Sequence, residues 1–444
     1  MPIPTTTVVY RVALRSMFAG AGLLVAIGCH ANASQRAPIG ADSTAIRRDI
    51  EYLASDSLEG RGTGTAGNDS AAAYIARRYQ ALGLGQLCLS RISSSSCERG
   101  WLQRFNATSV AATRAGLPGE LPTQNVVAVI AGSDPRLRGE YVVLGAHYDH
   151  LGRGRFGALD ADRGSEVRNG ADDNASGTVA VMELARLLES RPPRRSVVLA
   201  HFSGEELGLL GSREFVNRSP VPIDSVVAMV NFDMVGRMRG DKLIVYGTGT
   251  AAELPAIVDS ANVAGALALR TIPDGFGPSD HSSFYAKGIP VLHLFTDLHE
   301  DYHRATDDAD KINVAGTMRV IEYAERLTRL IADAPTRLTP VRSPAPAPVA
   351  SSGRGYGAYF GSIPDMGAGD VKGVRVSGVR EGSPADSAGV REGDVIVQFG
   401  GKPVNDLYEF TDVLRAHKPG DTVDVVVERS GQRVTLKATL RSRG

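Results

Sequence analysis

The segment YVVLGAHYD at residues 141–149 joins a run of apolar, mostly β-branched side chains to a histidine and an aspartate, His147 and Asp149. Two later segments have the same order, SVVLAHFSGEE at 196–206 and SVVAMVNFD at 225–233. Runs this short and this apolar are typical of strands in a parallel sheet that helices cover on both faces. The chain therefore predicts an α/β protein, a three-layer α/β/α sandwich with a mostly parallel central sheet.

Helix patterns lie before and between these runs. The first places Ile46, Ile50 and Leu53 on one face. Further helices are expected over residues 70–82, 176–189, 209–217, 252–264, 282–286 and 314–332. The remaining strand candidates are NVVAVIAG, KLIVYG and PVLHLF, whereas residues 88–124 look irregular. We therefore expect one α/β domain over residues 40–334.

The composition changes after this domain. Residues 335–353, PTRLTPVRSPAPAPVASSG, are rich in Pro, Ala and Ser, which predicts a semi-rigid linker. Residues 354–442 are rich in Val and Gly, with strand-like runs and a single helix pattern at 407–416. A second, small β-rich domain is expected there. A chain of 444 residues is also too long for one ordinary core.

The charge balance excludes one class of partner. Lys plus Arg equals Asp plus Glu, so the formal net charge is zero and there is no basic excess to neutralise phosphates. We therefore expect no nucleic-acid partner. Hydrophobic residues make up 43% and charged residues 22%, as in ordinary soluble globular proteins.

The N-terminal residues 1–33 resemble an export signal. Two arginines precede an apolar run at 17–28, which is too short to span a bilayer. Ala31-Asn32-Ala33 fits a cleavage site, whereas the preceding Ala-Ile-Gly-Cys fits a degenerate lipobox that would lipidate Cys29. We favour the lipidated form slightly. The protein is expected to be exported, either as a periplasmic or membrane-anchored lipoprotein or as a secreted protein.

Apart from Cys29, the chain has two cysteines, Cys88 and Cys97. They flank a Ser-rich run, and an exported protein meets oxidising conditions, so a local disulfide is reasonable. The alternative is a pair of unpaired thiols in a loop. Neither cysteine has the partner pattern of a catalytic nucleophile.

Acidic and histidine side chains fall where the predicted strands end. Glu205 and Glu206 follow one strand and Asp233 follows another, as His147 and Asp149 do. Each feature alone has an ordinary explanation, such as carboxylates at a helix start or a turn. Together they predict a cleft at the carboxyl edge of the sheet. A pair of zinc ions needs this mixture: a bridging carboxylate, terminal N and O ligands, and a separate carboxylate that accepts a proton from water.

Several segments in the same order resemble the co-catalytic di-zinc aminopeptidases related to bacterial leucyl aminopeptidase and to glutamate carboxypeptidase. The resemblance covers roughly residues 43–333. The segments that carry it are LASDSLEGRGTGTAGNDSAAAYIARRYQALGL, GAHYDHLG, NGADDNASG, SGEELGLLGS, NFDMVG, SDHSSFYAKGIPVLHLF and DYHRATDDADKIN.

The resemblance implies two Zn²⁺ ions and a role for each matching residue. The implied metal ligands are His147 and Asp233 for the first zinc, Glu206 and His303 for the second, and Asp172 as the bridge. Asp149 would lie behind His147, and Asp173 behind the ligands. The peptide between Asp172 and Asp173 is expected to be cis. The segment SDHSS gives Asp280 and His281 either a place behind the ligands or in the cleft wall, or only a helix cap.

The catalytic roles follow from the same resemblance. Glu205 would be the general base, and Tyr302 would donate a hydrogen bond to the oxyanion. Acidic groups, including Glu205 or Asp233, would hold the free amino terminus of a peptide substrate. The implied function is a zinc aminopeptidase that hydrolyses the N-terminal peptide bond.

Residues 382–406, GSPADSAGVREGDVIVQFGGKPVND, resemble PDZ domains of bacterial exported proteases. The resemblance implies a carboxylate-binding loop formed by Tyr359, Phe360, Gly361 and Ser362, which would capture the C-terminus of a peptide. Ser362 replaces the usual apolar residue, so its ligand stays open. The alternative is a domain that only packs against the catalytic unit.

Three alternatives remain for the whole chain. The first is a glutaminyl cyclase-like acyltransferase of the same fold, typically with one zinc. The second is a carboxypeptidase for acidic dipeptides, which would need a cluster of arginines, whereas only scattered candidates such as Arg237 are present. The third is a non-enzymatic peptide-binding scaffold.

Overall fold

The structure is a computed structural model. The described residues are 40–91, 97–108, 118, 120–153, 157–158, 160, 163–341, 358–364, 371–379, 382–405, 409–410, 413–414 and 416–442. The expected export signal, residues 1–33, lies outside them and stays a prediction. Within the described part of the chain, no helix combines the length and the apolar character needed to cross a membrane.

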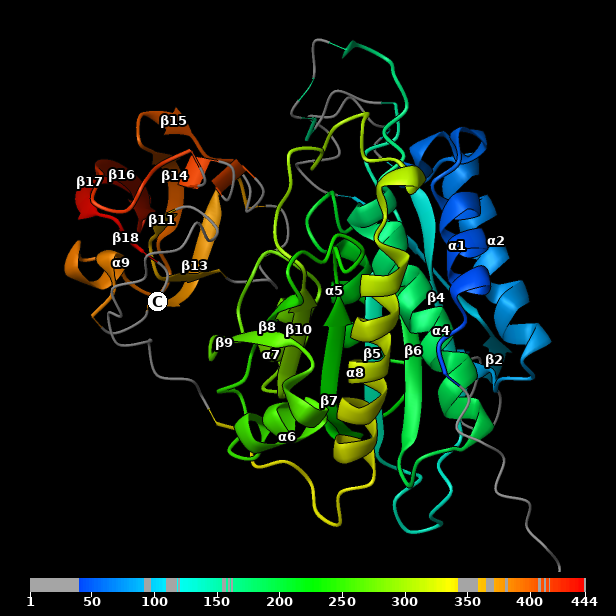
Figure 1. Ribbon diagram of the computed structural model, residues 1–444. Helices are drawn as coiled ribbons and strands as arrows, with labels where there is room; N and C mark the ends of the chain where they lie inside the picture. Colours follow the sequence, from blue (N-terminus) through cyan, green and yellow to red (C-terminus); the bar gives the residue numbers. More distant parts are fainter. Residues whose placement is uncertain are drawn as a thin grey trace, which may run out of the picture. The chain divides into compact units, whose positions relative to one another are not determined.

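A mixed sheet forms the centre of the larger domain (Figure 1). Its strands, in spatial order, are β3 (Leu102–Asn106), β4 (Pro122–Ile130), β6 (Ser196–Phe202), β5 (Tyr141–His147), β7 (Val226–Phe232), β10 (Val291–Phe295), β8 (Lys242–Tyr246) and β9 (Ala268–Ile272). The central strands β6, β5, β7 and β10 are parallel. Every residue of β6, β7 and β10 is buried, which explains their uninterrupted apolar sequences.

Helices pack on both faces of this sheet, which confirms the three-layer prediction (Figure 1). One core cluster takes in α1 (Ser43–Leu53), α2 (Ala66–Ala81), α4 (Gly177–Ser190), α6 (Leu254–Ala261) and α8 (Val314–Ala332). A second core cluster on the sheet takes in α5 (Leu210–Asn217) and α7 (His281–Tyr285). The helices agree with the predicted ranges except at α2 and α6. α2 begins earlier, because the Thr65 side chain accepts a hydrogen bond from Asn68 N–H and caps it. α6 is shorter than the predicted 252–264 and spans only Leu254–Ala261.

Residues 88–124, which looked irregular in the sequence, contain strands. Besides β3, the hairpin strands β1 (Leu87–Arg91) and β2 (Cys97–Gly100) lie there. β3 and β9 are edge strands, with exposed positions and no clean alternation of buried and exposed residues, so neither gave a readable pattern. Cys88 pairs in register with Arg99, and Cys97 with Arg91. The two cysteines are therefore not opposite each other, and no disulfide joins Cys88 to Cys97, which contradicts the expected disulfide.

The first part of the expected linker belongs to the α/β domain. Leu338 is buried in the main core, and Thr339 makes hydrogen bonds to the carboxylate of Glu253 through both its backbone N–H and its hydroxyl. Pro340 forms an isolated bridge with Ala251. The domain thus continues through residue 341 rather than ending at 334. Proline-rich composition alone could not distinguish a docked segment from a free one.

The C-terminal domain has its own β-rich core. Its larger sheet contains β12 (Ser362–Pro364), β13 (Val374–Val379), β14 (Val395–Phe399), β16 (Thr422–Arg429) and β17 (Gln432–Thr439), with β15 (Lys402–Pro403) beside β14. β11 (Ala358–Tyr359) pairs with β18 (Arg441–Ser442), and Pro384–Ser387 forms the short helix α9. The rings of Phe360, Phe399 and Phe410 pack edge to face at its centre. The helix expected over 407–416 lies partly outside the described residues.

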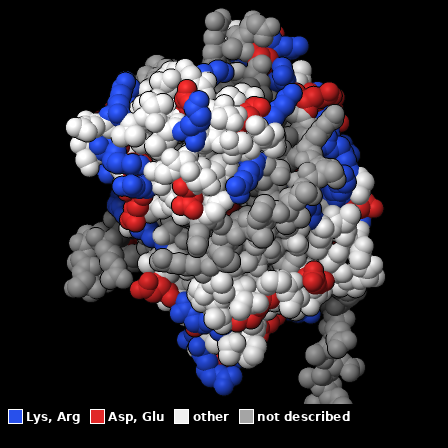
Figure 2. Space-filling view, turned by 90° about the vertical axis from the view of Figure 1, so that its left-hand side faces the viewer, with Lys and Arg blue, Asp and Glu red and all other residues white. Residues whose placement is uncertain are grey.

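Acidic side chains lie among the basic ones on the surface. Figure 2 shows positively and negatively charged side chains on one face of the molecule, in keeping with the balanced composition.

Candidate metal centre

The site lies where the central parallel strands end. His147 is the last residue of β5, Asp233 directly follows β7, and Glu205 and Glu206 lie just beyond β6. Because these strands are parallel neighbours, their carboxyl ends meet at one edge of the sheet. This placement confirms the expectation that acidic and histidine side chains converge there.

Two groups of side chains meet on the carboxylate of Asp173. On one side, His147 Nε2 lies 3.3 Å from Asp173 Oδ1 and 3.5 Å from Asp233 Oδ1. On the other side, His303 Nε2 lies 3.1 Å from Asp173 Oδ2 and 3.3 Å from Glu206 Oε2. The two oxygens of one carboxylate therefore face two different imidazoles.

The structure exchanges the positions expected for the side chains of the two neighbouring aspartates. The Asp172 carboxylate turns away from the cluster: Oδ1 accepts hydrogen bonds from Gly236 N–H (2.7 Å) and the Ser176 hydroxyl (3.0 Å), and Oδ2 lies 3.1 Å from His299 Nε2. The expectation of a bridging Asp172 is therefore contradicted by its position. The cis peptide is at Asp173-Asn174, so its predicted location was also one residue too early.

Asp149 holds two of the site residues. His147 Nδ1 lies 3.1 Å from the backbone carbonyl oxygen of Asp149 and 3.8 Å from its Oδ1. The same carboxylate accepts hydrogen bonds from the Thr63 hydroxyl (2.8 Å) and from Glu205 N–H (3.2 Å). The expected support of His147 thus comes mainly from the backbone of Asp149, while its carboxylate orients the Glu205 segment.

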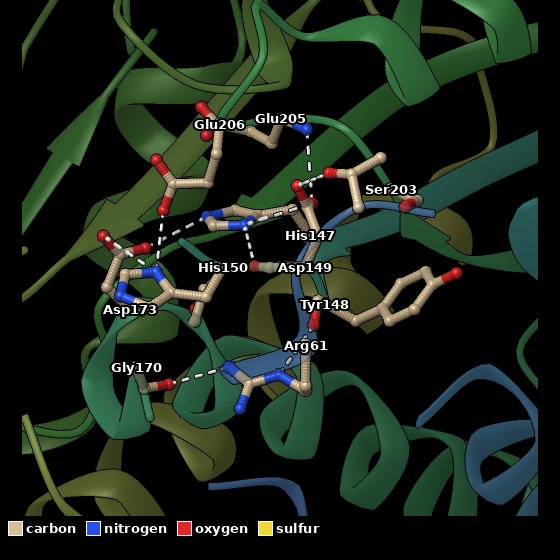
Figure 3. A network of polar contacts seen from close by, with 12 residues as sticks. Arg61, His147, Tyr148, Asp149, His150, Gly170, Asp173, Ser203, Glu205 and Glu206 are labelled. Atoms are coloured by element: carbon tan, nitrogen blue, oxygen red, sulfur yellow. Dashed lines mark hydrogen bonds and ion pairs between the residues drawn. The ribbon is translucent and has the colours of Figure 1, made fainter. Parts of the chain in front are cut away.

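A third histidine, His150, belongs to the cluster and was not singled out from the sequence. Its Nδ1 lies 2.7 Å from Glu206 Oε1 and 3.8 Å from Asp173 Oδ2. Figure 3 shows Glu206, His150 and Asp173 pointing toward one another. His150, Asp173 and Glu206 form one geometric group suited to a cation, and His147, Glu205 and Asp233 form another. The segment HYDH already held this histidine beside His147, but it lies beyond the end of the strand pattern.

Tyr302 packs against a site histidine. Its ring stacks on the imidazole of His303, with ring centroids 3.9 Å apart. His303 Nδ1 lies 2.8 Å from the carbonyl oxygen of Gly157, which leaves Nε2 directed at Asp173. The expected hydrogen bond from Tyr302 to an oxyanion stays a prediction.

The residues of SDHSS lie in a buried layer. Asp280 and His281 are fully buried at the start of α7, and the Asp280 side chain does not cap this helix. The ring of His281 stacks on His293 with centroids 4.5 Å apart. Burial raises the pKa of Asp280 to about 7. The helix-cap explanation for Asp280 is therefore wrong.

The electrostatics of the cluster favour a cation. Burial, together with Glu206, Asp280 and Asp233, raises the pKa of Glu205 well above its usual value, although His147 opposes the shift. Burial would lower the pKa of His147, but the surrounding carboxylates raise it. Within the described part of the chain, no Lys or Arg pairs with the site carboxylates, which are Asp173, Glu205, Glu206 and Asp233. Buried carboxylates without a basic partner suit a metal ion.

In the C-terminal domain, the expected carboxylate-binding loop joins β11 to β12. Phe360 is buried in the domain core, and Gly361 has φ of +93°, a conformation that glycine adopts without strain. A Cβ atom at Gly361 would lie 2.3 Å from Ser383 Cβ. The loop therefore approaches α9 closely, and this approach requires glycine.

The structure thus combines a mixed α/β domain, with two groups of potential metal ligands at one edge of its sheet, and a β-rich domain. Residues 125–328 match the sequence model of Peptidase family M28, and residues 349–440 match that of the PDZ domain. The α/β domain is thus similar to peptidase family M28, and the C-terminal domain is similar to PDZ domains.

Individual relatives cover parts of the chain. Leucine aminopeptidase 2 of Trichophyton rubrum is 27% identical over 248 residues, which are 48% of this chain and 47% of that protein. The chain spans about half or less of the length of the curated relatives it matches.

Two solved structures share the fold. A Zn-dependent exopeptidase from Parabacteroides distasonis has a TM-score of 0.53 at 18% identity, covering 67% of this chain and 99% of that chain. A glutaminyl cyclase from Porphyromonas gingivalis has a TM-score of 0.52 at 18% identity, covering 65% and 98%. At these identities the likeness shows the fold alone.

Proposed function

We propose that the chain is a zinc aminopeptidase that removes the N-terminal residue of peptides. The observation that carries this proposal is the Asp173 carboxylate, whose two oxygens face His147 and His303. Each imidazole also has its own carboxylate neighbour, Asp233 for His147 and Glu206 for His303. A bridge with two such ends suits a pair of metal ions.

The donor atoms fit two zinc ions. His147 and Asp233 would hold the first ion, Glu206 and His303 would hold the second, and Asp173 would join them. Imidazole nitrogens and carboxylate oxygens are common zinc ligands, and among the described residues no Lys or Arg forms an ion pair with these carboxylates. Zinc bound there would supply Lewis acidity, lowering the pKa of a water toward about 7 and polarising the scissile carbonyl.

Glu205 is the proposed general base. Its carboxylate lies in the group with His147 and Asp233, and its backbone N–H is fixed by Asp149. A largely buried carboxylate with a raised pKa is suited to take a proton from water and return it to the leaving amine. The Glu206 carboxylate lies 2.7 Å from His150 Nδ1 and 3.3 Å from His303 Nε2, which suits a zinc ligand, so we assign the proton to Glu205.

An apolar cluster beside the site indicates the preferred substrate. Met234 follows Asp233 directly, and it packs with Phe295, Leu298 and Tyr302, the last of which precedes His303. Leu298 and Tyr302 are only partly buried, so a substrate side chain held near the ligands would contact these two members of the cluster. We therefore propose a preference for peptides with an apolar N-terminal residue.

The alternatives of the same fold are less well supported. A carboxypeptidase for acidic dipeptides needs free arginines, but Arg237 donates to Asp301 at 2.8 Å, and the fully buried Arg61 donates to the carbonyl oxygens of Tyr148, Asn169 and Gly170. A glutaminyl cyclase typically works with one zinc, whereas both ligand groups are present here. Cyclase activity is therefore an outcome that the test must be able to reveal.

The PDZ domain is proposed to bind the C-terminus of a peptide. Support comes from the Gly361 conformation in the loop Tyr359–Ser362 and from the sheet that this loop enters through β12. Fluorescence polarisation with peptides that end in a free carboxylate, compared with the same peptides amidated, tests the proposal. Equal binding of both series would contradict it.

Release of free amino acids from short peptides tests the main proposal. Each peptide is assayed beside its N-acetylated form, with chelator and after zinc is restored. Release that requires zinc and a free amino terminus supports an aminopeptidase. Cyclisation of N-terminal glutamine without hydrolysis would identify the cyclase, and a protein without zinc or activity would leave the peptide-binding scaffold.

A further inference from the structure

The loop that carries His303 also holds the turn that carries Asp173. Further along this loop, Asp307 Oδ2 accepts hydrogen bonds from two successive backbone N–H groups, those of Asp172 (2.9 Å) and Asp173 (3.0 Å). The backbones are tied as well, since Ala171 N–H donates to the Asp307 carbonyl oxygen at 3.0 Å. Three contacts therefore connect two segments that lie far apart in the sequence.

Asp307 is fully buried, so water does not compete for these bonds. Its other oxygen, Oδ1, lies 3.9 Å from Arg237 Nη1, and Arg237 also donates to Asp301 at 2.8 Å. Hydrogen bonds to an ionised acceptor are about twice as strong as neutral ones. A carboxylate that holds two successive peptide groups fixes the orientation of both peptide planes, and with them the direction in which the Asp173 side chain leaves the backbone.

We propose that Asp307 is a positioning residue of the zinc site, which holds the Asp173 carboxylate between His147 and His303. The inference rests on the proposed zinc centre and adds a coupling to it. Because His303 and Asp307 belong to one loop, a displacement of this loop moves a terminal ligand and the bridging ligand together. Neither ligand group is then complete without the Asp307 contact.

Zinc affinity of the full-length protein tests this coupling. Asp307→Asn keeps the size of the side chain and removes its charge. Residues that support metal ligands in this way typically change affinity by about 10–100-fold, and a loss of that size is expected in competition titrations with a chromogenic chelator. The matched control is Asp308→Asn in the same loop, whose carboxylate accepts instead from Asn169 Nδ2 at 2.9 Å. The control is expected to bind zinc as the unsubstituted protein does.

The cobalt(II) absorption spectrum adds a readout that a loss of stability alone would not change. An altered spectrum for Asp307→Asn, with that of Asp308→Asn unchanged, supports the positioning role. Equal zinc affinity and equal spectra for Asp307→Asn and the unsubstituted protein would overturn it. Failure of the unsubstituted protein to bind zinc is a separate result, because it would refute the proposed function itself.

Hydrogen exchange keeps the inference testable if Asp307→Asn does not fold. In the unsubstituted, zinc-free protein, the amides of Asp172 and Asp173 are expected to exchange as slowly as those of β5. Exchange as fast as that of an exposed loop would show that Asp307 does not hold this turn before metal binds, and would overturn the inference.

Discussion

The hydroxyl of Thr63 donates a hydrogen bond of 2.8 Å to Asp149 Oδ2, and this contact links the loop before α2 to the end of β5. Through its other oxygen, Oδ1, Asp149 accepts a hydrogen bond from Glu205 N–H.

Thr63→Val removes the donor with almost no change of shape. We expect kcat to fall by about tenfold with a smaller change in KM, since an outer contact of this kind positions the catalytic group. Steady-state kinetics measures the effect, and Thr63→Ser should restore most of the rate.

Glu205→Gln is expected to lower kcat by about 10²–10⁴-fold, because an amide cannot accept the proton. Zinc content, measured by mass spectrometry of the metal, should stay at the unsubstituted level. Glu214→Gln, a glutamate of α5 that pairs with Arg218, is the matched control. If Glu205→Gln loses a zinc ion, then Glu205 is a ligand and the assigned roles are wrong.

Asp172 and Asp173 allow a test of the bridging ligand. Asp173→Asn is expected to lose bound zinc, because its two oxygens face the two ligand groups. Asp172→Asn should keep zinc. It should instead lower the free energy of unfolding by about 1–3 kcal/mol, because the Asp172 carboxylate accepts hydrogen bonds from Gly236 N–H and the Ser176 hydroxyl. Metal analysis and urea unfolding of both variants separate the two effects. The opposite pattern would restore Asp172 as the bridge.

Removal of metal should destabilise the protein. The buried carboxylates of the site repel one another without a cation, so chelation is expected to lower Tm and added zinc to restore it. A ligand at 100 times its Kd stabilises the folded state by about 2.7 kcal/mol. Differential scanning calorimetry with and without chelator measures the change. Identical Tm values would show that the native fold does not bind zinc.

A buried histidine away from the site predicts a dependence of stability on pH. Burial lowers the pKa of His201 to about 3, and its Nε2 lies 2.5 Å from the Tyr79 hydroxyl. The unfolded chain takes up a proton near pH 6.5, at about the usual pKa of histidine, whereas the folded protein does not. The free energy of unfolding should therefore fall as pH decreases from about 6.5 toward 3. Urea unfolding of His201→Gln at several pH values should show a shallower dependence, and an unchanged slope would contradict this explanation.

The fold could be predicted because its signals are local. Each central strand is an apolar run with a polar residue at its end. A parallel sheet that is buried on both faces requires apolar side chains at nearly every strand position, so these runs are easy to recognise. The edge strand β9 gave no such signal, since it is partly exposed and its sequence ALRTI does not alternate cleanly. Residues 335–341 were likewise missed, because the contacts that fix Leu338 and Thr339 come from a distant part of the domain.

Most residues of the proposed site could be named from the sequence. His147, Glu206, Asp233 and His303 lie together as the resemblance implied, but Asp172 and Asp173 could not be told apart. Asp307, in a distant loop, accepts hydrogen bonds from the backbone N–H groups of both residues. A contact between distant loops leaves no trace in the local spacing of the motif.

The docked segment 335–341 determines which contacts of the α/β domain a pulling force from its C-terminal side would reach first. Val341 N–H donates to the Thr250 carbonyl oxygen at 2.9 Å, and the Thr250 hydroxyl is in turn bonded to Val291 at the start of β10. Tension applied through the C-terminal domain would therefore pull first on this anchor. The end of α8 would be loaded only after the contacts of Leu338 and Thr339 had been broken.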